Sequence, residues 1–244
     1  MSGLGIVTAL AAESRTLGRP ASASARIATL PDGTRVAVSG VGRAAAADCA
    51  RWLAESGANA LISWGMAGGL DPALGAGTLA LPREVISAQG ERFATAPQWR
   101  TSLACAVAAD QTVSEGALLT CVAPLGSPAD KAAAFRTTAA VAVDMESDAV
   151  AQVAASHALP FLAVRAIVDT ADDALPPALT AAVVAAGTLR GQQVIAALLQ
   201  APGEMAALMR LAWAYRAARR SLIAVARSGA LAPPTAPSPA AALA

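Results

Sequence analysis

The hydrophobic positions of the chain fall into short runs, and alanine-rich stretches with helical composition separate them. Six apolar runs predict buried strands, at residues 4–9, 35–40, 59–65, 116–122, 140–144 and 160–169. Three intervening segments predict helices, at residues 43–57, 128–136 and 146–157. Buried strands that alternate with helices are typical of an α/β fold. We therefore expect a single-domain α/β sandwich with a central mixed, mostly parallel sheet flanked by helices.

The pattern changes after Asp173. Residues 178–200 predict two short helices, and 203–228 predict a longer one. One apolar stripe follows the longer helix: Leu208, Leu211, Tyr215, Ala218, Leu222 and Val225. Three arginines lie on its other side: Arg216, Arg220 and Arg227. We divide the chain into a main domain (1–200), an amphipathic helix (201–228) and a disordered Pro/Ala-rich tail (229–244).

Composition narrows the classes of protein to consider. The net charge of +1 argues against nucleic-acid binding. No apolar run reaches the roughly 18 residues that cross a bilayer, and the first residues lack a secretory pattern, so we expect a cytoplasmic protein. Three cysteines (Cys49, Cys105 and Cys121) form no CxxC pair, and His157 is expected to end a helix. We expect reduced thiols, no metal and no cofactor.

Candidate chemistry lies where strands end, because open α/β sheets bind ligands beyond the carboxyl ends of their strands. Four places carry suitable residues: Glu13, an expected glycine-rich loop at 65–69, Asp144-Met145-Glu146, and Asp169 with Arg165. Carboxylates that converge there would suit cleavage of a glycosidic bond. Each place also has a structural alternative. Glu13 could cap a helix, and the glycines could form a turn. Glu146 could be an ordinary acid in the first turn of a helix, and Arg165 could be the salt-bridge partner of Asp169.

Ordered motifs decide between these alternatives. The segments AVDMESDAVAQVAA (142–155) and LPFLAVRAIVDTADD (159–173) resemble the nucleosidases that cleave methylthioadenosine and adenosylhomocysteine. The SWGMAGGLDP segment (63–72) and the strand before Glu13 match in the same order. The chain is thus similar to the nucleoside phosphorylase and nucleosidase superfamily over roughly residues 4–200.

The resemblance implies roles for individual residues. Asp169 would be the general acid that protonates the purine at N7, and Glu13 would orient or deprotonate the attacking water. Glu146 would accept hydrogen bonds from the ribose hydroxyls, with Met145 packed under the sugar. The backbone of Ala67 and Gly68 would line the pocket.

The chain also departs from the pattern of these nucleosidases. Met66 and Val168 stand where the related enzymes usually carry serines, which makes the site more apolar and less suited to phosphate. These departures and the stretch 198–222 resemble the hopanoid-associated phosphorylases. That resemblance implies release of adenine from adenosylhopane, a nucleoside with a lipid tail. We expect a homo-oligomer, and the amphipathic helix either packs on protein or contacts the inner face of the membrane.

Other readings stay open at this point. The Gly40–Ala45 segment formally fits GxGxxA, but a dinucleotide site needs an acid at the end of the next strand, which finishes in Ser63-Trp64-Gly65. Gly42 and Arg43 could instead contact phosphate or the 5′ side of the ribose. A methylthioadenosine/adenosylhomocysteine nucleosidase and a non-catalytic nucleoside or lipid carrier are further alternatives. The acceptor is either water or phosphate as a co-substrate.

Overall fold

The centre of the sheet is made of parallel strands from distant parts of the chain. The computed structural model describes residues 3–20, 22–23, 26–175 and 205–233. β1 (Leu4–Thr8) lies between β4 (Arg35–Val38) and β5 (Ala60–Gly69), parallel to both. β12 (Phe161–Asp169) runs parallel to β5 on its other side. These buried strands are the apolar runs of the sequence, as predicted.

Short strands complete the sheet around this centre. β11 (Ala142–Asp144) pairs antiparallel with the end of β5, and β10 (Leu118–Thr120) and β7 (Glu84–Ile86) follow in parallel. Five others are β2 (Ser22–Ala23), β3 (Ile27–Thr29), β6 (Leu79–Ala80), β8 (Arg92–Ala94) and β9 (Val113–Ser114). Among the described residues, twelve strands form one mixed sheet. The predicted α/β class is confirmed.

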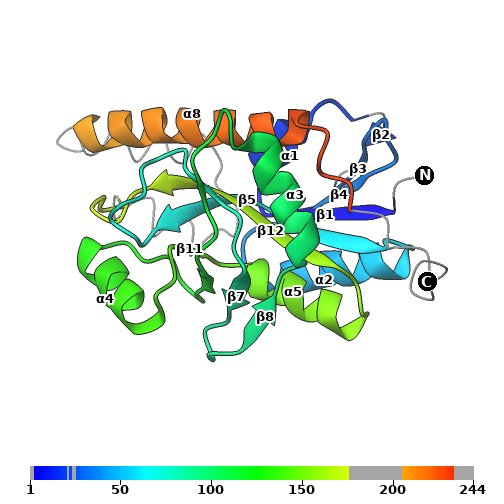
Figure 1. The fold of residues 1–244 in the computed structure, drawn as a ribbon, viewed down its shortest axis with the longest axis horizontal. Coiled ribbons are helices and arrows are strands. Elements are labelled where there is room, and N and C mark those ends of the chain that lie inside the picture. Colours follow the sequence, from blue (N-terminus) through cyan, green and yellow to red (C-terminus); the bar gives the residue numbers. More distant parts are fainter. Residues whose placement is uncertain (1–2, 21, 24–25, 176–204, 234–244) are drawn as a thin grey trace, which may run out of the picture.

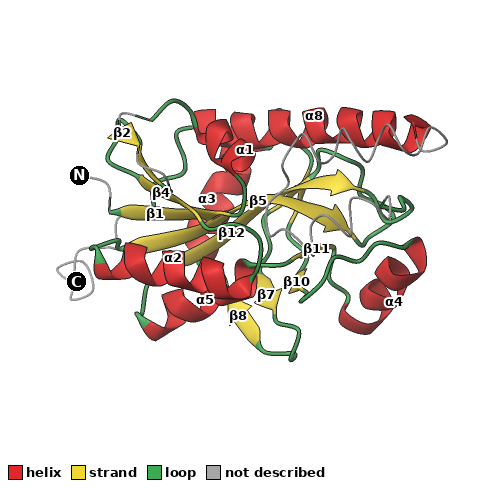
Figure 2. Cartoon of the chain, turned by 180° about the vertical axis from the view of Figure 1, so that it is seen from behind, coloured by secondary structure: helices red, strands yellow, loops and turns green. Residues whose placement is uncertain are grey.

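Helices cover both faces of this sheet (Figure 1). α2 (Arg43–Glu55) and α5 (Ser147–Ser156) pack together on one face. α3 (Pro97–Val107) and α8 (Met205–Arg227) cover the other, while α1 (Ala11–Ser14) and the 3-10 turn η1 (Arg15–Leu17) follow β1. α4 (Pro128–Thr138) stands at the end of the sheet near β11 (Figure 2). Each side of the central strands is thereby buried.

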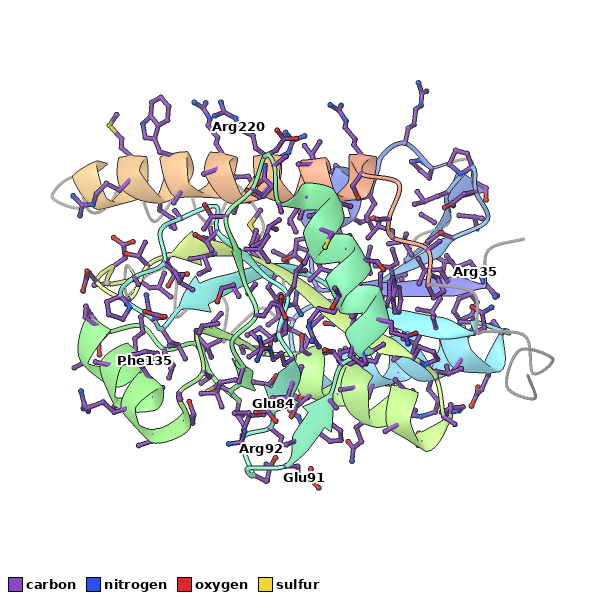
Figure 3. All side chains as sticks on the ribbon, viewed as in Figure 1. Arg35, Glu84, Glu91, Arg92, Phe135 and Arg220 are labelled. Atoms are coloured by element: carbon purple, nitrogen blue, oxygen red, sulfur yellow. The ribbon has the colours of Figure 1, made fainter. Side chains whose placement is uncertain are left out.

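α8 packs on the body of the protein through its apolar stripe. Ala218, Leu222 and Val225 are fully buried in the cluster that lies under α3, and the Ser221 hydroxyl donates to the Gly77 carbonyl at 2.6 Å. Arg220 points away from the body (Figure 3). The idea that this stripe enters a membrane is therefore wrong, because the sheet and α3 already cover it. In the described part of the chain, no helix is long and apolar enough to span a membrane.

Several smaller predictions can also be compared with the structure. His157 follows the last residue of α5 as its C-cap, as expected, and all three cysteines are free. The segment 70–115 has no predicted element, and the structure places there the helix α3 and four strands of two or three residues, which are too short to show a period. The two short helices predicted over 178–200, the side chain of Leu208 and most of the predicted tail lie outside the described residues.

Candidate active site

A buried arginine organises the polar interior of the sheet. Arg165, in the middle of β12, forms an ion pair with Asp144 at 2.6 Å. Its Nη2 group also donates to the hydroxyls of Ser63 at 2.7 Å and Ser147 at 3.0 Å. The alternative that Arg165 pairs with Asp169 is wrong, since the partner lies on β11. The ion pair therefore joins the end of β11 to the middle of β12 across β5.

Glu13 lies next to this arginine, on α1, the short helix that follows β1. Its Oε1 atom accepts the N–H of Met66 and Oε2 accepts that of Leu10, both at 2.9 Å. A Cβ atom on Gly65 would lie 2.4 Å from both the Arg165 guanidinium and the Glu13 carboxylate. Glu13 therefore caps α1 by accepting the N–H of Leu10, as the capping alternative predicts, and it also lies beside Arg165. Burial raises the pKa of Glu13, and the charge of Arg165 opposes that rise.

Glu146 is the third carboxylate near Arg165. It immediately precedes α5, and its Oε1 atom accepts the N–H of Gly42 at 2.9 Å. Burial first, and then the charge of Asp144, raise its pKa to about 7, while Arg165 opposes the rise. Glu146 is thus not an ordinary first-turn acid, because its carboxylate bonds a loop on another part of the sheet.

Asp169 ends β12 beyond an irregularity in the strand. The register with β5 shifts between Ile167 and Asp169, so that Asp169 pairs with Gly68. A bulge re-aims the side chains that follow it. A Cβ atom on Gly68 would lie 3.2 Å from the Asp169 carboxylate. Gly65 and Gly68 are three positions apart on β5, roughly 10 Å in an extended strand.

A lysine that the sequence analysis missed holds Asp169. Lys131, on α4, is fully buried and places its Nζ atom 2.5 Å from Asp169 Oδ2. Burial raises the pKa of Asp169, and the Lys131 ammonium opposes that rise. One signal in the sequence could have found this residue, because it is the only lysine in a chain with 18 basic residues.

The glycine-rich segment is not a loop, contrary to the expectation, because β5 continues through Gly69. Its small residues make room for the side chains of Glu13, Arg165 and Asp169 rather than only for a ligand. Ala67 is buried in the cluster beneath α2 and α5, whereas Met66, Met145 and Val168 are half-buried. The predicted residues thus lie along β5 and the ends of its neighbours.

Two residues considered for phosphate already have partners within the chain. The Gly42 N–H binds the Glu146 carboxylate, and the Arg43 guanidinium forms an ion pair with Asp148 at 2.8 Å. A phosphate at this place would meet two carboxylates. The structure therefore lends no support to a phosphate role for Gly42 and Arg43.

The surface beside Asp169 is hollowed. This hollow is lined by Val168, Asp169 and Leu175 from the end of β12 and the segment after it, and by Arg210, Leu211 and Ala214 from α8. A larger cavity of about 330 Å³ lies between β8, α5 and the start of β12, at the other end of that strand. We place the candidate site at the Asp169 end, because burial raises the pKa of Asp169 there and Arg165 on the same strand lies beside Glu13 and Glu146, whose pKa values are also raised.

Comparisons with known proteins place the fold. The crystal structure of 5′-methylthioadenosine/S-adenosylhomocysteine nucleosidase from Neisseria meningitidis, in complex with methylthio-immucillin-A, is 20% identical. That match covers 92% of this chain and 96% of the other, with a TM-score of 0.69. S-adenosylhomocysteine nucleosidase from Streptococcus pyogenes is 22% identical over 69% and 84% of the two chains, with a TM-score of 0.59.

A third similar structure is a mutant of futalosine hydrolase from Helicobacter pylori. It is 16% identical over 68% of this chain and 89% of the other, with a TM-score of 0.60. A search of curated proteins finds no match. The family described as the phosphorylase superfamily matches residues 6–201, which is most of the chain and nearly all of the sheet. This protein therefore belongs to the phosphorylase superfamily.

Proposed function

We propose that this protein cleaves the N-glycosidic bond of an adenine nucleoside. One observation carries the proposal: a buried Asp169 with a raised pKa ends β12, the strand whose Arg165 interacts with the carboxylates of Glu13 and Glu146. A raised pKa helps a carboxyl group to hold the proton that general acid catalysis requires. The superfamily match supports the same reaction, as do the similar structures, which include nucleosidases for 5′-methylthioadenosine and S-adenosylhomocysteine.

Each carboxyl group has one task in this reaction. Asp169 donates its proton to N7 of the purine, so that adenine leaves as a neutral base while the ribose gains oxocarbenium character. Glu146 accepts hydrogen bonds from the ribose hydroxyls. Glu13 orients the attacking water or takes its proton. Met145 packs under the sugar, and the backbone of Ala67 and Gly68 lines the pocket.

Water is the acceptor that the geometry favours. Gly42 and Arg43 already bind carboxylates, and Met66 and Val168 bring apolar side chains where phosphate would need polar ones. A desolvated phosphate needs hydrogen-bond donors or cations, which these residues do not offer. Phosphate as a co-substrate remains the alternative that the experiment below decides.

For the substrate we propose adenosylhopane, whose adenine would be released during hopanoid lipid synthesis. The stretch 198–222, which resembles the hopanoid-associated phosphorylases, supports this substrate. The hollow beside Asp169 has Val168, Leu175 and Leu211 among its walls, together with the charged Asp173 and Arg210. Methylthioadenosine or adenosylhomocysteine is the second candidate, which the similarity to nucleosidases for these compounds favours. A carrier would not need three buried carboxylates of this kind.

A lipid substrate also requires access to a membrane. The outward face of α8 exposes Met209 by 58% and Trp213 by 63%, and the guanidinium of Arg216 lies 5.5 Å from the Trp213 ring centre. Tryptophan and arginine together suit the headgroup region of an anionic bilayer. We propose that the protein is cytoplasmic and a homo-oligomer, and touches the inner membrane through this face rather than through the buried stripe.

The decisive experiment incubates the purified protein with adenosylhopane and with methylthioadenosine, each with and without phosphate, and identifies products by mass. We expect free adenine in all four reactions, faster release from adenosylhopane, and a sugar product without phosphate. A phosphorylated sugar would identify phosphate as the acceptor. Release of adenine from methylthioadenosine alone would assign the second substrate, and binding without release would leave only the carrier.

A further inference from the structure

Lys131 has no role in the reaction proposed above, yet it is the most deeply buried cation near the site. It lies in the first turns of α4, a helix that Ser127 caps by accepting the N–H of Asp130 at 3.1 Å. Its side chain is fully buried. Burying an ammonium group costs several kcal/mol unless charges and hydrogen bonds compensate. The contacts of Lys131 must therefore be specific.

All three protons of the ammonium group have acceptors. Nζ donates to Asp169 Oδ2 at 2.5 Å, to the carbonyl of Thr170 at 2.6 Å and to that of Asp173 at 2.9 Å. The Asp173 carboxylate in turn accepts the N–H of Thr170 at 2.9 Å and its hydroxyl at 2.8 Å. The turn after β12 is thus closed around one cation, and Asp169 belongs to the same network.

We propose that Lys131 is a positioning residue for the reaction, because its ammonium group fixes the direction of the Asp169 carboxyl group and ties the turn 170–173 to it. This inference rests on the proposed function, since it acts through Asp169 as the general acid. Charge-assisted hydrogen bonds are strong enough to hold one orientation of a carboxyl group. A neutral side chain of the same length would fill the space without holding it.

A cation at this place also has a consequence for pH. The charged groups near Asp169 are Lys131 from α4 and Asp173 from the turn, and Arg210 of α8 acts on Asp173. A general acid works only while it holds its proton, so the pKa of Asp169 sets the upper pH limit of activity. Removing the ammonium charge raises that pKa, because a neighbouring cation favours the carboxylate.

The first test is the pH profile of kcat/KM on an adenine nucleoside. In Lys131→Met, we expect kcat to fall and the basic limb to move to higher pH by roughly one unit or more. The matched control is Phe135→Leu, at another side chain of α4 (Figure 3), which weakens the packing of this helix on the cluster around Leu70 and Leu119. If Lys131 only supported the fold, both variants would lose activity with the basic limb unmoved, and the proposal would be overturned.

The second test needs no turnover. Lysine labelled with ¹⁵N gives one side-chain NMR signal in this protein, because Lys131 is the only lysine. Asp169→Asn should shift that signal, whereas Asp148→Asn, which alters a buried aspartate paired with Arg43, should leave it in place. A signal indifferent to Asp169→Asn would overturn the proposal even where Lys131→Met fails to fold.

The two tests separate the two inferences. If the wild type does not cleave adenine nucleosides, the proposed function fails and the positioning role fails with it, although the NMR shift still reports the ion pair. If the wild type cleaves them and the Lys131→Met profile keeps its basic limb, the positioning role alone fails.

Discussion

Among single residues, Asp169 is the group on which the proposed chemistry depends most directly. Adenine is a poor anionic leaving group, so Asp169→Asn should lower kcat by roughly two to four orders of magnitude. The change also leaves the buried Lys131 ammonium without its carboxylate, which costs about 3–5 kcal/mol of stability. Activity is therefore measured well below the unfolding midpoint, on protein shown to be folded by circular dichroism. Turnover within a few-fold of wild type would exclude Asp169 as the acid.

Glu146 should contribute through the ribose hydroxyls. Hydrogen bonds to a buried carboxylate are worth about 1.5–3 kcal/mol each. Glu146→Ala should therefore weaken the binding of ribonucleosides strongly. It should barely affect the binding of 2′,3′-dideoxy analogues, which cannot make these hydrogen bonds. Binding of both sugar types is measured by calorimetry. An equal loss for both would contradict the role.

The raised pKa of Glu146 also predicts how stability depends on pH. Folded Glu146 keeps its proton up to about pH 7, whereas the unfolded chain releases it near its ordinary value of 4.5. Between these two pH values the unfolded state binds fewer protons than the folded state. The contribution of Glu146 to the free energy of unfolding is therefore full below pH 4.5 and is lost as pH rises through about 7. Glu146→Gln imitates the protonated form and removes that loss.

The midpoints of thermal unfolding should show this between pH 5 and pH 8. The Tm of Glu146→Gln minus that of wild type should become more positive as pH rises. Glu91→Gln, a change at an exposed glutamate, is the control and should give a constant difference. Parallel curves for Glu146→Gln and wild type would show that Glu146 does not titrate in this range.

At the scale of elements, β5 is the strand that keeps the polar groups in place. Gly65 has no room for a Cβ atom, because the Arg165 and Glu13 side chains fill that space. Gly65→Ala should displace both groups, cost about 1–3 kcal/mol of stability and lower kcat/KM. Gly75, where a Cβ atom meets nothing within 4 Å, is the matched control. Gly75→Ala should leave kcat/KM unchanged, and urea unfolding together with kinetics on both variants checks the pair. Equal losses of stability and of kcat/KM in the two variants would mean that the lack of space at Gly65 does not explain why this position is a glycine.

At the scale of the whole molecule, α8 packs its apolar stripe on the body of the protein and exposes arginines on its opposite face. Each arginine near an anionic membrane surface adds about 1 kcal/mol. Replacing Arg216, Arg220 and Arg227 by Gln should therefore weaken binding to anionic vesicles by roughly 100-fold or more. It should also slow turnover of membrane-borne adenosylhopane while leaving turnover of a soluble nucleoside unchanged.

The control removes the same charge from other exposed sites, with Arg51, Arg83 and Arg92 replaced by Gln. Vesicle sedimentation measures both triple variants. If wild-type protein does not sediment with anionic vesicles, the membrane contact is excluded.

The sequence by itself determined the α/β class and the long central strands. Runs such as 160–169 are apolar because both faces of the sheet are covered, and burial of this kind is visible in the order of residues. The sequence also predicted that acidic residues lie at one edge of the sheet. Each follows a strand, and parallel strands have their carboxyl ends at the same edge. The stripe of α8 was readable too, although not the surface that it covers.

Only the tertiary structure decided the partners of these side chains. Arg165 lies four residues before Asp169, yet its ion pair is with Asp144, and Asp169 instead receives Lys131 from α4. A shift of register near Val168 and the meeting of distant helices and strands produce these pairs. Such contacts depend on how segments far apart in the chain come together, and local periodicity contains no record of that. For the same physical reason, the sequence predicts only a loop at Gly65. In the structure, a glycine is required there because the side chains of Arg165 on β12 and Glu13 on α1 fill the space of a Cβ atom.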